Sequence, residues 1–210
     1  MRCDSPFSIK DGSAYYDVRC NRCYNCKLTR VRQWVFRCQE ELKVSDSGHF
    51  ITLTYDNDHV PRTTSGFNCL WPRDLTLFWK NLRYYHGKEN DTIIKYYVCG
   101  EYGDRRKRPH YHAIVFNVLD EELFQKAWKK GTVHVGNPDQ DAIAYCMKYI
   151  DKKRRIPEFE GDDRIPEFSR MSRGIGYSYL ESNAEWHLKS LDRNYVIEKN
   201  GKKLEMPRYY

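Results

Sequence analysis

The 210 residues of this chain suffice for one domain with its own core, and a hydrophobic share of 40% supplies the apolar side chains for it. The formal charge of +7 and the pI near 8.9 favour a polyanionic partner, although many soluble proteins are equally basic. No apolar run reaches membrane-spanning length, and Arg2, Asp4 and Lys10 interrupt the segment that a secretion signal would need. These features argue against a membrane-spanning or secreted protein, and we expect a cytosolic one.

Eight cysteines in a cytosolic chain are expected to be free thiols or metal ligands rather than disulfides. Four thiolates complete a tetrahedral zinc site, and the N-terminal segment supplies four cysteines, of which the last three are spaced as in tight turns around a metal. The alternative is a reduced cluster in which one or two members bind nothing. The cluster consists of Cys3, Cys20, Cys23 and Cys26, whereas the scattered cysteines, interpreted as small apolar residues, are Cys38, Cys69, Cys99 and Cys146.

The first predicted helix covers residues 27–43, where apolar side chains recur at helical spacing. Its other faces are basic and can follow a phosphate backbone, or they form an ordinary solvated surface. The basic residues of these faces are Lys27, Arg30, Arg32 and Arg37.

A half-buried strand follows at residues 50–55, where Ile51, Leu53 and Tyr55 alternate with two threonines. We expect this strand near the centre of a sheet. Residues 57–69 have the composition of an exposed loop, and Pro72 then begins a helix with an apolar inner face.

Two further strands, at residues 93–101 and 110–117, are expected to pair as a hairpin across a short basic connection. His110 and His112 share one face because side chains at i and i+2 of a strand point the same way, and the pairing brings Glu101 near them. Two imidazoles and one carboxylate suit Mg²⁺ or Mn²⁺ when a substrate phosphate completes the coordination. The alternative is a pair of ordinary strand histidines. The connection would attract a phosphodiester through Arg105, Arg106, Lys107 and Arg108.

A helix at residues 121–129 and a strand at residues 131–136 complete the predicted core. The order strand, helix, two strands, helix, strand predicts an α+β fold, in which a central antiparallel sheet is covered by helices on one face. Histidines and tyrosines would meet on the open face. His134 lies in the last of these strands and is interpreted as structural.

Residues 139–152 predict a second kind of helix, in which two tyrosines avoid the core. Ile143, Met147 and Ile150 form its apolar stripe. A phenol with a pKa of about 10 is a weak nucleophile at neutral pH. A nearby ammonium or metal ion favours the phenolate or neutralises the charge that develops on a phosphate under attack. The polar side of this helix carries Tyr145, Lys148, Tyr149 and Lys152.

The C-terminal part holds two copies of Arg-Ile-Pro-Glu-Phe, at residues 155–159 and 164–168, interpreted as a local duplication in a loop without an assigned function. Residues 195–199 and 202–206 predict a hairpin, with a type I′ turn at Asn200-Gly201. The sequence contains no Gly-x-x-x-x-Gly-Lys-Ser/Thr loop, which argues against a helicase motor of that type.

Taken together, the histidine strand, the strand before it and the tyrosine helix resemble the rolling-circle replication initiators of the HUH endonuclease superfamily. The sequence is most similar to the initiators of gokushovirus-like phages of the Microviridae, which have small circular single-stranded DNA genomes. The matching motifs occur in the family's order over nearly the whole chain: Cys20-x-x-Cys23-x-x-Cys26, Gly100-Glu101-Tyr102-Gly103, Arg108-Pro109-His110-Tyr111-His112, Tyr145-x-x-x-Tyr149 and Pro207-Arg208-Tyr209-Tyr210.

The resemblance implies an HUH, ferredoxin-like endonuclease domain that nicks single-stranded DNA at a replication origin. A divalent cation held by His110, His112 and Glu101 would polarise the scissile phosphate, and Tyr145 or Tyr149 would attack it. The products would be a 5′-phosphotyrosine link and a free 3′-hydroxyl, followed later by religation of the circle. Lys148 and Lys152 would stabilise charge during the attack, while Arg30, Arg37 and residues 105–108 would bind DNA.

A host DNA polymerase and a host helicase are the implied protein partners, in the cytoplasm of a bacterial host. The expected organisation is a single initiator domain over residues 1–210. It would comprise a Cys-rich segment at 1–27, a catalytic core at 28–153 and a C-terminal extension at 154–210.

Two other classes of function compete with a replication initiator. One is a non-catalytic, zinc-dependent nucleic-acid-binding protein, in which the cysteine cluster and the basic helix act and the two histidines are incidental. The other is a plasmid mobilisation relaxase, which uses the same chemistry. Relaxases typically place the tyrosine before the histidine motif, whereas here it follows, and this order favours the replication initiator.

Overall fold

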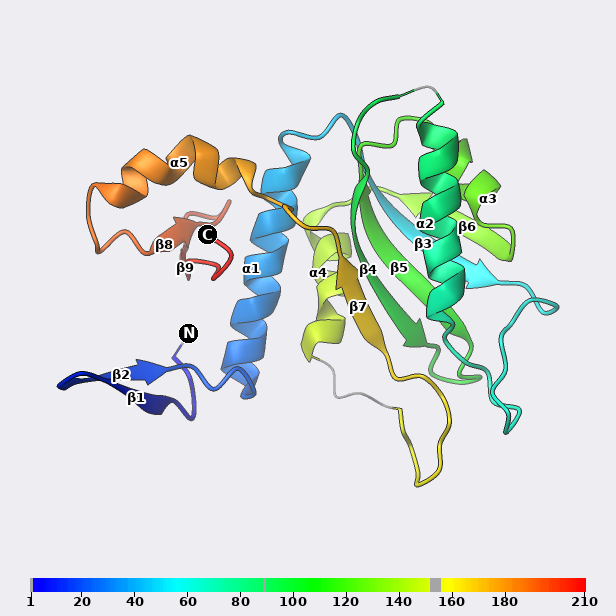
Figure 1. Ribbon diagram of the computed structural model, residues 1–210, viewed down its shortest axis with the longest axis horizontal. Helices are drawn as coiled ribbons and strands as arrows, with labels where there is room; N and C mark the ends of the chain where they lie inside the picture. Colours follow the sequence, from blue (N-terminus) through cyan, green and yellow to red (C-terminus); the bar gives the residue numbers. More distant parts are fainter. Residues whose placement is uncertain (1, 89, 152–155) are drawn as a thin grey trace.

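The computed structural model describes residues 2–88, 90–151 and 156–210, and for residues 148–151 it describes the backbone alone. Its centre is a five-stranded antiparallel sheet with the strand order β6-β3-β5-β4-β7 (Figure 1). The predicted α+β class with an antiparallel sheet is confirmed, and the strand expected near the centre lies between two others. The strands are β3 (Gly48–Tyr55), β4 (Lys95–Tyr102), β5 (Pro109–Phe116), β6 (Gly131–Gly136) and β7 (Phe168–Met171).

Alternation along the strands gives the sheet two apolar faces. On β5, Tyr111 and Val115 belong to one buried cluster, and Ile114 and Phe116 belong to another. The first face packs against helices α2 (Pro72–His86) and α3 (Glu122–Ala127), and the second against α1 (Tyr24–Leu42) and α4 (Gln140–Asp151) (Figure 1).

Helices therefore lie on both faces of the sheet, and the expectation that they cover only one face is wrong. The physical reason is that the apolar stripes of α1 and α4 also require burial. Cys38 from α1, with Ile143 and Met147 from α4, is fully buried against this second face. The predicted open face is thus reduced to the part of the sheet that carries His110 and His112, which retain side-chain exposures of 21% and 10%.

The segment boundaries follow the sequence pattern closely, with local differences at the ends. Helix α1 begins at Tyr24, earlier than predicted, because the Cys23 side chain accepts a hydrogen bond from the backbone N–H of Cys26 and so caps the helix. Strands β4 and β5 pair as the predicted hairpin. Among the described residues, no helix is both long enough and apolar enough to cross a membrane.

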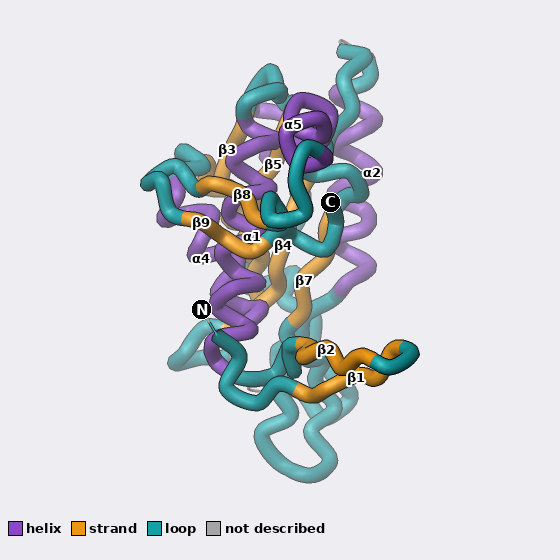
Figure 2. The backbone as a smooth tube through the Cα atoms, turned by 90° about the vertical axis from the view of Figure 1, so that its left-hand side faces the viewer, coloured by secondary structure: helices purple, strands orange, loops and turns teal. Residues whose placement is uncertain are grey.

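The two terminal segments lie on the side of α1 away from the sheet (Figures 1 and 2). The N-terminal one is a separate hairpin of β1 (Phe7–Asp11) and β2 (Ala14–Val18). The C-terminal one contains α5 (Ser178–Leu188) and the hairpin of β8 (Tyr195–Ile197) and β9 (Lys203–Glu205). Val196 and Leu204 of that hairpin pack with Phe36 of α1 in a third, small core.

The C-terminal hairpin has a different turn from the predicted one. A type I′ turn at Asn200-Gly201 requires positive φ at both residues, but only Gly201 has it, with φ +77°. The N–H of Gly201 donates to the carbonyl of Glu198 at 2.8 Å, so the turn is centred one residue earlier. Gly201 then takes the left-handed position that follows a type I turn in a three-residue hairpin loop.

Candidate active site and metal centres

Three predicted metal ligands meet at one end of the β4–β5 hairpin. Glu101 and His110 are directly paired across the two strands, and His112 lies two residues further along the same face. Glu101 Oε1 lies 2.8 Å from His110 Nε2 and 2.9 Å from His112 Nε2. One ligand atom from each of the three residues lies within 4.8 Å of the other two, which is compatible with a shared ion.

Both imidazoles are oriented by a second hydrogen bond. The backbone carbonyl of Arg108 lies 3.1 Å from His110 Nδ1, and the Thr52 hydroxyl lies 2.9 Å from His112 Nδ1. A carbonyl can only accept, so His110 carries its proton on Nδ1 and directs its other ring nitrogen toward Glu101. Metal-binding histidines are typically held in this way by an outer hydrogen bond. The donor set of two imidazoles and one carboxylate fits a divalent cation such as Mn²⁺ or Mg²⁺.

The carboxylate of Glu101 is buried and ionised. Burial raises its pKa, but the hydrogen bonds and charges of His110 and His112 outweigh burial and lower the pKa to about 2. A metal ligand must be deprotonated, and Glu101 meets this condition throughout the physiological pH range.

Tyr145 of α4 reaches the same carboxylate oxygen. Its hydroxyl donates to Glu101 Oε1 at 3.2 Å, and its ring stands edge-on to His112 with centroids 5.0 Å apart. The His112 ring also stacks on Phe50, at 5.6 Å with an interplanar angle of 6°. Tyr145 nevertheless keeps 38% of its surface exposed. The phenol is therefore positioned by the protein and accessible to a substrate.

The surroundings of Tyr145 disfavour its phenolate as long as Glu101 is the nearest charge. Burial, followed by the negative charge of Glu101, raises the pKa of the Tyr145 hydroxyl to about 12. A cation bound beside Glu101 opposes this effect, because it stabilises the phenolate directly and reduces the field of the carboxylate.

Three further predicted catalytic residues lie outside the described part of the chain or at its limit. Lys148 and Tyr149 fall within α4, but their side chains are not among those that the structure describes. Lys152 lies outside the described residues. Their predicted roles remain predictions.

The predicted DNA-binding residues of the β4–β5 connection divide into two pairs. Arg105 and Arg106 are exposed at the tip of the hairpin. Lys107 forms an ion pair with Glu158 at 2.7 Å. Arg108 donates to the Asn57 side chain at 2.8 Å and to the Tyr55 carbonyl at 2.5 Å, which fixes the connection near His110. The first pair is thus the more available to a ligand.

The two predicted DNA-binding arginines of α1 also differ. Arg30 is exposed, whereas Arg37 is buried with its guanidinium over the rings of Trp34 and Tyr209. Arg37 Nε donates to the Ile175 carbonyl at 3.0 Å. Arg37 therefore joins three segments of the chain, while Arg30 remains open to solvent.

The four N-terminal cysteines form a compact sulfur cluster at the start of α1. The sulfur of Cys3 lies 3.5 Å from that of Cys20 and 3.9 Å from that of Cys23, and Cys20 and Cys26 are 3.9 Å apart. A zinc ion with Zn–S bonds of about 2.3 Å in tetrahedral geometry requires sulfur separations of about 3.8 Å. The cluster therefore fits zinc.

Backbone donors around these sulfurs favour thiolates. The N–H groups of Arg22 and Cys23 point to Cys20 Sγ at 3.4 and 3.3 Å. These hydrogen bonds lower the pKa of the Cys20 thiol to about 6, whereas burial raises the pKa of Cys26 to about 11.

Sequence reasoning misses the residues that support the ligands. The alternation of its strand assigns Thr52 only to the polar side, although pairing of Thr52 with His112 places its hydroxyl against the imidazole. Nothing in the sequence identifies Phe50, two residues earlier on the same face, as the ring that stacks on His112. The period-2 pattern of β3 contains this signal once the register with β5 is known. His134 pairs with Thr52 from the other side and is exposed on the same face.

Comparisons with known proteins can now be set beside this geometry. The chain matches the model of the replication-associated protein ORF2 family over residues 48–154, which include β3 to β6 and all of α4. A comparison with solved structures finds no match.

Three curated relatives share similarity over nearly the whole chain. Replication-associated protein ORF2 of Spiroplasma virus 4 is 30% identical over 92% of this chain and 66% of its own length. Replication-associated protein VP4 of Bdellovibrio phage phiMH2K is 30% identical over 94% and 67%, respectively. Replication-associated protein ORF4 of Chlamydia phage 1 is 27% identical over 98% and 57%. The chain spans about two thirds of the length of the first two relatives, and it belongs to the ORF2 family of replication-associated proteins.

Proposed function

We propose that this protein is a rolling-circle replication initiator of the HUH class, which nicks single-stranded phage DNA at its origin. The observation that carries the proposal is the convergence of the Tyr145 hydroxyl and both imidazoles on one oxygen of Glu101. A nucleophile, a metal ligand set and an open approach are the parts that a tyrosine endonuclease needs.

His110, His112 and Glu101 would hold a divalent cation, Mn²⁺ or Mg²⁺. When bound, the cation supplies Lewis-acid polarisation of the scissile phosphate and stabilises the charge that develops on it. The protein itself orients the three ligands, through the Arg108 carbonyl, the Thr52 hydroxyl and the Phe50 ring. This support holds the donor atoms in place before the substrate arrives.

Tyr145 is assigned the first attack, because its hydroxyl already lies at the metal ligands. The phenolic oxygen forms a bond to phosphorus, the bond to the 3′-oxygen breaks, and the phenolic proton is transferred through Glu101 or solvent to the departing 3′-oxygen. The products are a 5′-phosphotyrosine link and a free 3′-hydroxyl. Tyr149, one helical turn further along α4, would perform the second cleavage, which allows religation of the circle.

The free 3′-hydroxyl would be extended by a host DNA polymerase, with strand separation by a host helicase. The three relatives are named as replication-associated proteins, and their sources are a virus of Spiroplasma and phages of Bdellovibrio and Chlamydia. By analogy, we assign the work of this protein to the cytoplasm of a bacterial host. Arg105 and Arg106, at the tip beside the ligands, would contact the DNA backbone.

The test is formation of a covalent protein–DNA adduct. Purified protein is incubated with circular single-stranded DNA of its own replicon and Mn²⁺, and denaturing gels together with peptide mapping locate the link. We expect an adduct on Tyr145 that falls at least a hundredfold in Tyr145→Phe and in His110→Ala, and that disappears with chelator. Tyr84→Phe, an exposed tyrosine of α2, is the matched control and should leave the adduct unchanged.

The same experiment ranks the second tyrosine. Tyr149→Phe should permit the first cleavage but abolish the second strand transfer, which is read from the loss of recircularised product. If the protein binds origin DNA tightly but wild type never forms an adduct, the nickase proposal fails. The zinc-dependent binding protein then becomes the better interpretation, since the sulfur distances of the cysteine cluster favour such a module.

A further inference from the structure

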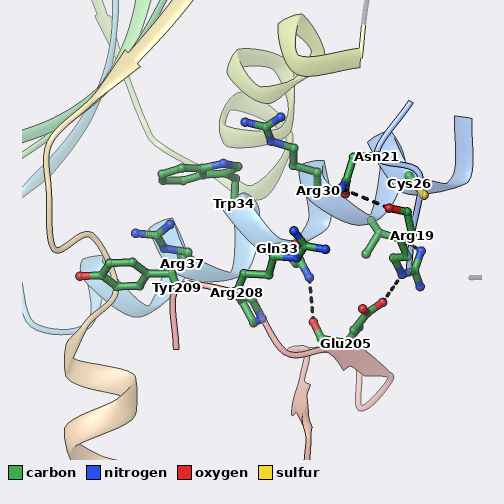
Figure 3. A pocket seen from close by; sticks show the side chains of 12 residues that line it. Arg19, Asn21, Cys26, Arg30, Gln33, Trp34, Arg37, Glu205, Arg208 and Tyr209 are labelled. Carbon is green, nitrogen blue, oxygen red and sulfur yellow. Dashed lines mark hydrogen bonds and ion pairs between the residues drawn. The ribbon is translucent and has the colours of Figure 1, made fainter. Parts of the chain in front are cut away.

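A second basic site lies far from the histidines along the fold, in a groove beside α1. The groove, of about 380 Å³, is bounded by the first half of α1, the residues after β2 and the C-terminal segment (Figure 3). It is lined by Arg19, Arg30, Trp34, Arg37, Arg208 and Tyr209, among others. Its walls come from segments nearly two hundred residues apart, so it exists only in the folded chain.

The charge of this groove is predominantly positive. Four arginines line it against one carboxylate, Glu205, and that carboxylate forms an ion pair with Arg19 at 2.5 Å. Arg30 and Arg208 are exposed, and among the described residues neither has a carboxylate within ion-pair distance. Guanidinium groups in this state suit phosphate groups, to which they donate bidentate hydrogen bonds.

Aromatic rings form part of the groove wall and are held in place by a buried cation. The guanidinium of Arg37 lies 4.1 Å from the centre of the Trp34 ring and 3.9 Å from that of Tyr209 (Figure 3). Arg37 is only 8% exposed, whereas Tyr209 keeps 41% of its surface exposed. A fixed and accessible ring beside free guanidinium groups offers a base a surface for stacking.

The groove is also connected to the candidate active site. Trp34 packs 5.1 Å from Tyr97 of β4, the strand that carries Glu101. Helices α1 and α4 lie side by side, with Gln39 hydrogen-bonded to Gln140, and they run in opposite directions (Figure 1). In Figure 3, Arg30 points toward α4, the helix of the proposed nucleophile. A strand that leaves Tyr145 therefore meets basic side chains of α1 on its way to the groove.

We propose that this groove is a second binding site for single-stranded DNA, resting on the nickase function proposed above. Phosphates bind Arg30 and Arg208, and a base stacks on Tyr209. A single strand fits better than a duplex, because only unpaired bases can present a face to a ring. The groove would hold the nicked strand on one side of the break while Tyr145 holds the other end.

The experiment compares binding of two charge-reversal variants with equal change in net charge. Arg30→Glu/Arg208→Glu alters the groove, and Arg73→Glu/Lys80→Glu alters two exposed residues of α2 on the other face of the sheet. The probe is a fluorescent 20-nucleotide poly-dT strand at about 0.15 M salt without divalent metal, and binding is followed by anisotropy. We expect at least tenfold weaker binding for the groove variant and less than twofold for the control.

Two further readouts separate a local contact from a general charge effect. The slope of log K against log salt should fall by about 1.4 for the groove variant, because two phosphate contacts on a single strand contribute about 0.7 each. A poly-dT strand substituted with 5-bromodeoxyuridine should photocrosslink to Tyr209 or Trp34. Circular dichroism of the variants checks that both remain folded.

Several results would overturn the groove proposal. Unchanged binding of the groove variant, an equal loss in the control, or crosslinks confined to the strands of the central sheet would each do so. An equally large loss of duplex binding would point to a different nucleic acid. The adduct assay keeps the two proposals distinct. If wild type forms no adduct but the groove variant loses single-strand binding, the nickase fails and the groove stands; a normal adduct with unchanged binding means the reverse.

Discussion

Glu101 is the residue on which the candidate active site depends. One of its oxygens receives hydrogen bonds from His110, His112 and Tyr145, so that three side chains from one strand and a helix are positioned by a single atom. Both imidazoles are themselves held by neighbours that do not touch Glu101. Precision at the reacting atoms therefore comes from residues behind them.

Thr52→Val tests that dependence. The change keeps the shape of the side chain but removes the hydroxyl that lies 2.9 Å from His112 Nδ1. With its outer hydrogen bond lost, the imidazole is less well oriented, and we expect Mn²⁺ affinity to fall by about 10–100-fold. Isothermal titration calorimetry measures the affinity, and the Mn²⁺ concentration needed for half-maximal adduct should rise in parallel.

Thr54→Val is the matched control for this prediction. Thr54 lies two residues further along the same strand face, but its hydroxyl donates to the Thr132 carbonyl and to no histidine. The control should retain wild-type Mn²⁺ affinity. Equal losses in both variants would mean that β3 is merely destabilised and that Thr52 does not orient the ligand.

At the scale of elements, Gly176 shows how closely the connection before α5 approaches α1. Its φ is +73°, its N–H donates to Glu41 at 2.8 Å, and an added Cβ would lie 2.6 Å from the carbonyl oxygen of Arg37. Gly176→Ala should lower the free energy of unfolding by about 1–2 kcal/mol through the left-handed backbone alone, and further through the clash with the backbone of α1.

Gly201→Ala separates these two effects in the measurement. Gly201 has a similar φ of +77°, but a Cβ there would meet no atom within 4 Å. Urea denaturation of both variants should therefore show the larger loss for Gly176→Ala. Equal losses would show that the connection moves aside and that the close packing on α1 contributes nothing.

Elements with strong periodicity are predictable from the sequence, and the site follows from them. The alternation of Ile51, Leu53 and Tyr55 predicts β3, and the pairing of residues 93–101 with residues 110–117 correctly brings Glu101 to His110. The helical stripe of Ile143 and Met147 likewise places Tyr145 off the core, as observed. In these cases local pattern and tertiary packing agree.

Elements without such a pattern escape prediction, each for a physical reason. Helix α5 buries none of its residues fully, so it has no apolar stripe to detect. The hairpin of β1 and β2 exposes apolar residues such as Phe7 and Tyr16 and has no core face. Strand β7 begins at Phe168, the last residue of the second Arg-Ile-Pro-Glu-Phe copy, and its place at the sheet edge depends on partners distant in sequence. Non-local pairing of this kind leaves little trace in a single segment.

The whole molecule is arranged around α1. One side of the helix packs with α4 against the sheet, and its other side meets the C-terminal hairpin through Phe36. Its first turn is part of the cysteine cluster, where Cys23 and Cys26 lie three residues apart. Through this single helix, the proposed zinc site, the proposed DNA groove and the helix of Tyr145 are mechanically connected.

Removal of zinc tests how much of the molecule depends on the cluster. Cys3 contacts Cys20 and Cys23 through sulfur separations of 3.5 and 3.9 Å, and β1 and β2 form no sheet with any other described strand. Four thiolates this close repel one another without a cation, so loss of zinc should release the N-terminal hairpin. Elemental analysis should find one zinc per chain, and none in Cys20→Ser. The buried Cys38→Ala, outside the cluster, should retain it.

Hydrogen exchange then locates the consequence. In the zinc-free protein, amides of residues 7–18 should exchange at the rate of an unfolded chain, and those in the first turn of α1 should lose most of their protection. Amides of β3 and β5 should remain protected, because their core with α2 and α3 does not include the cluster. Binding of poly-dT should weaken together with α1, while adduct formation on a short oligonucleotide should persist. Global unfolding without zinc would instead mean that the sheet cannot form until the cluster has fixed α1 in place.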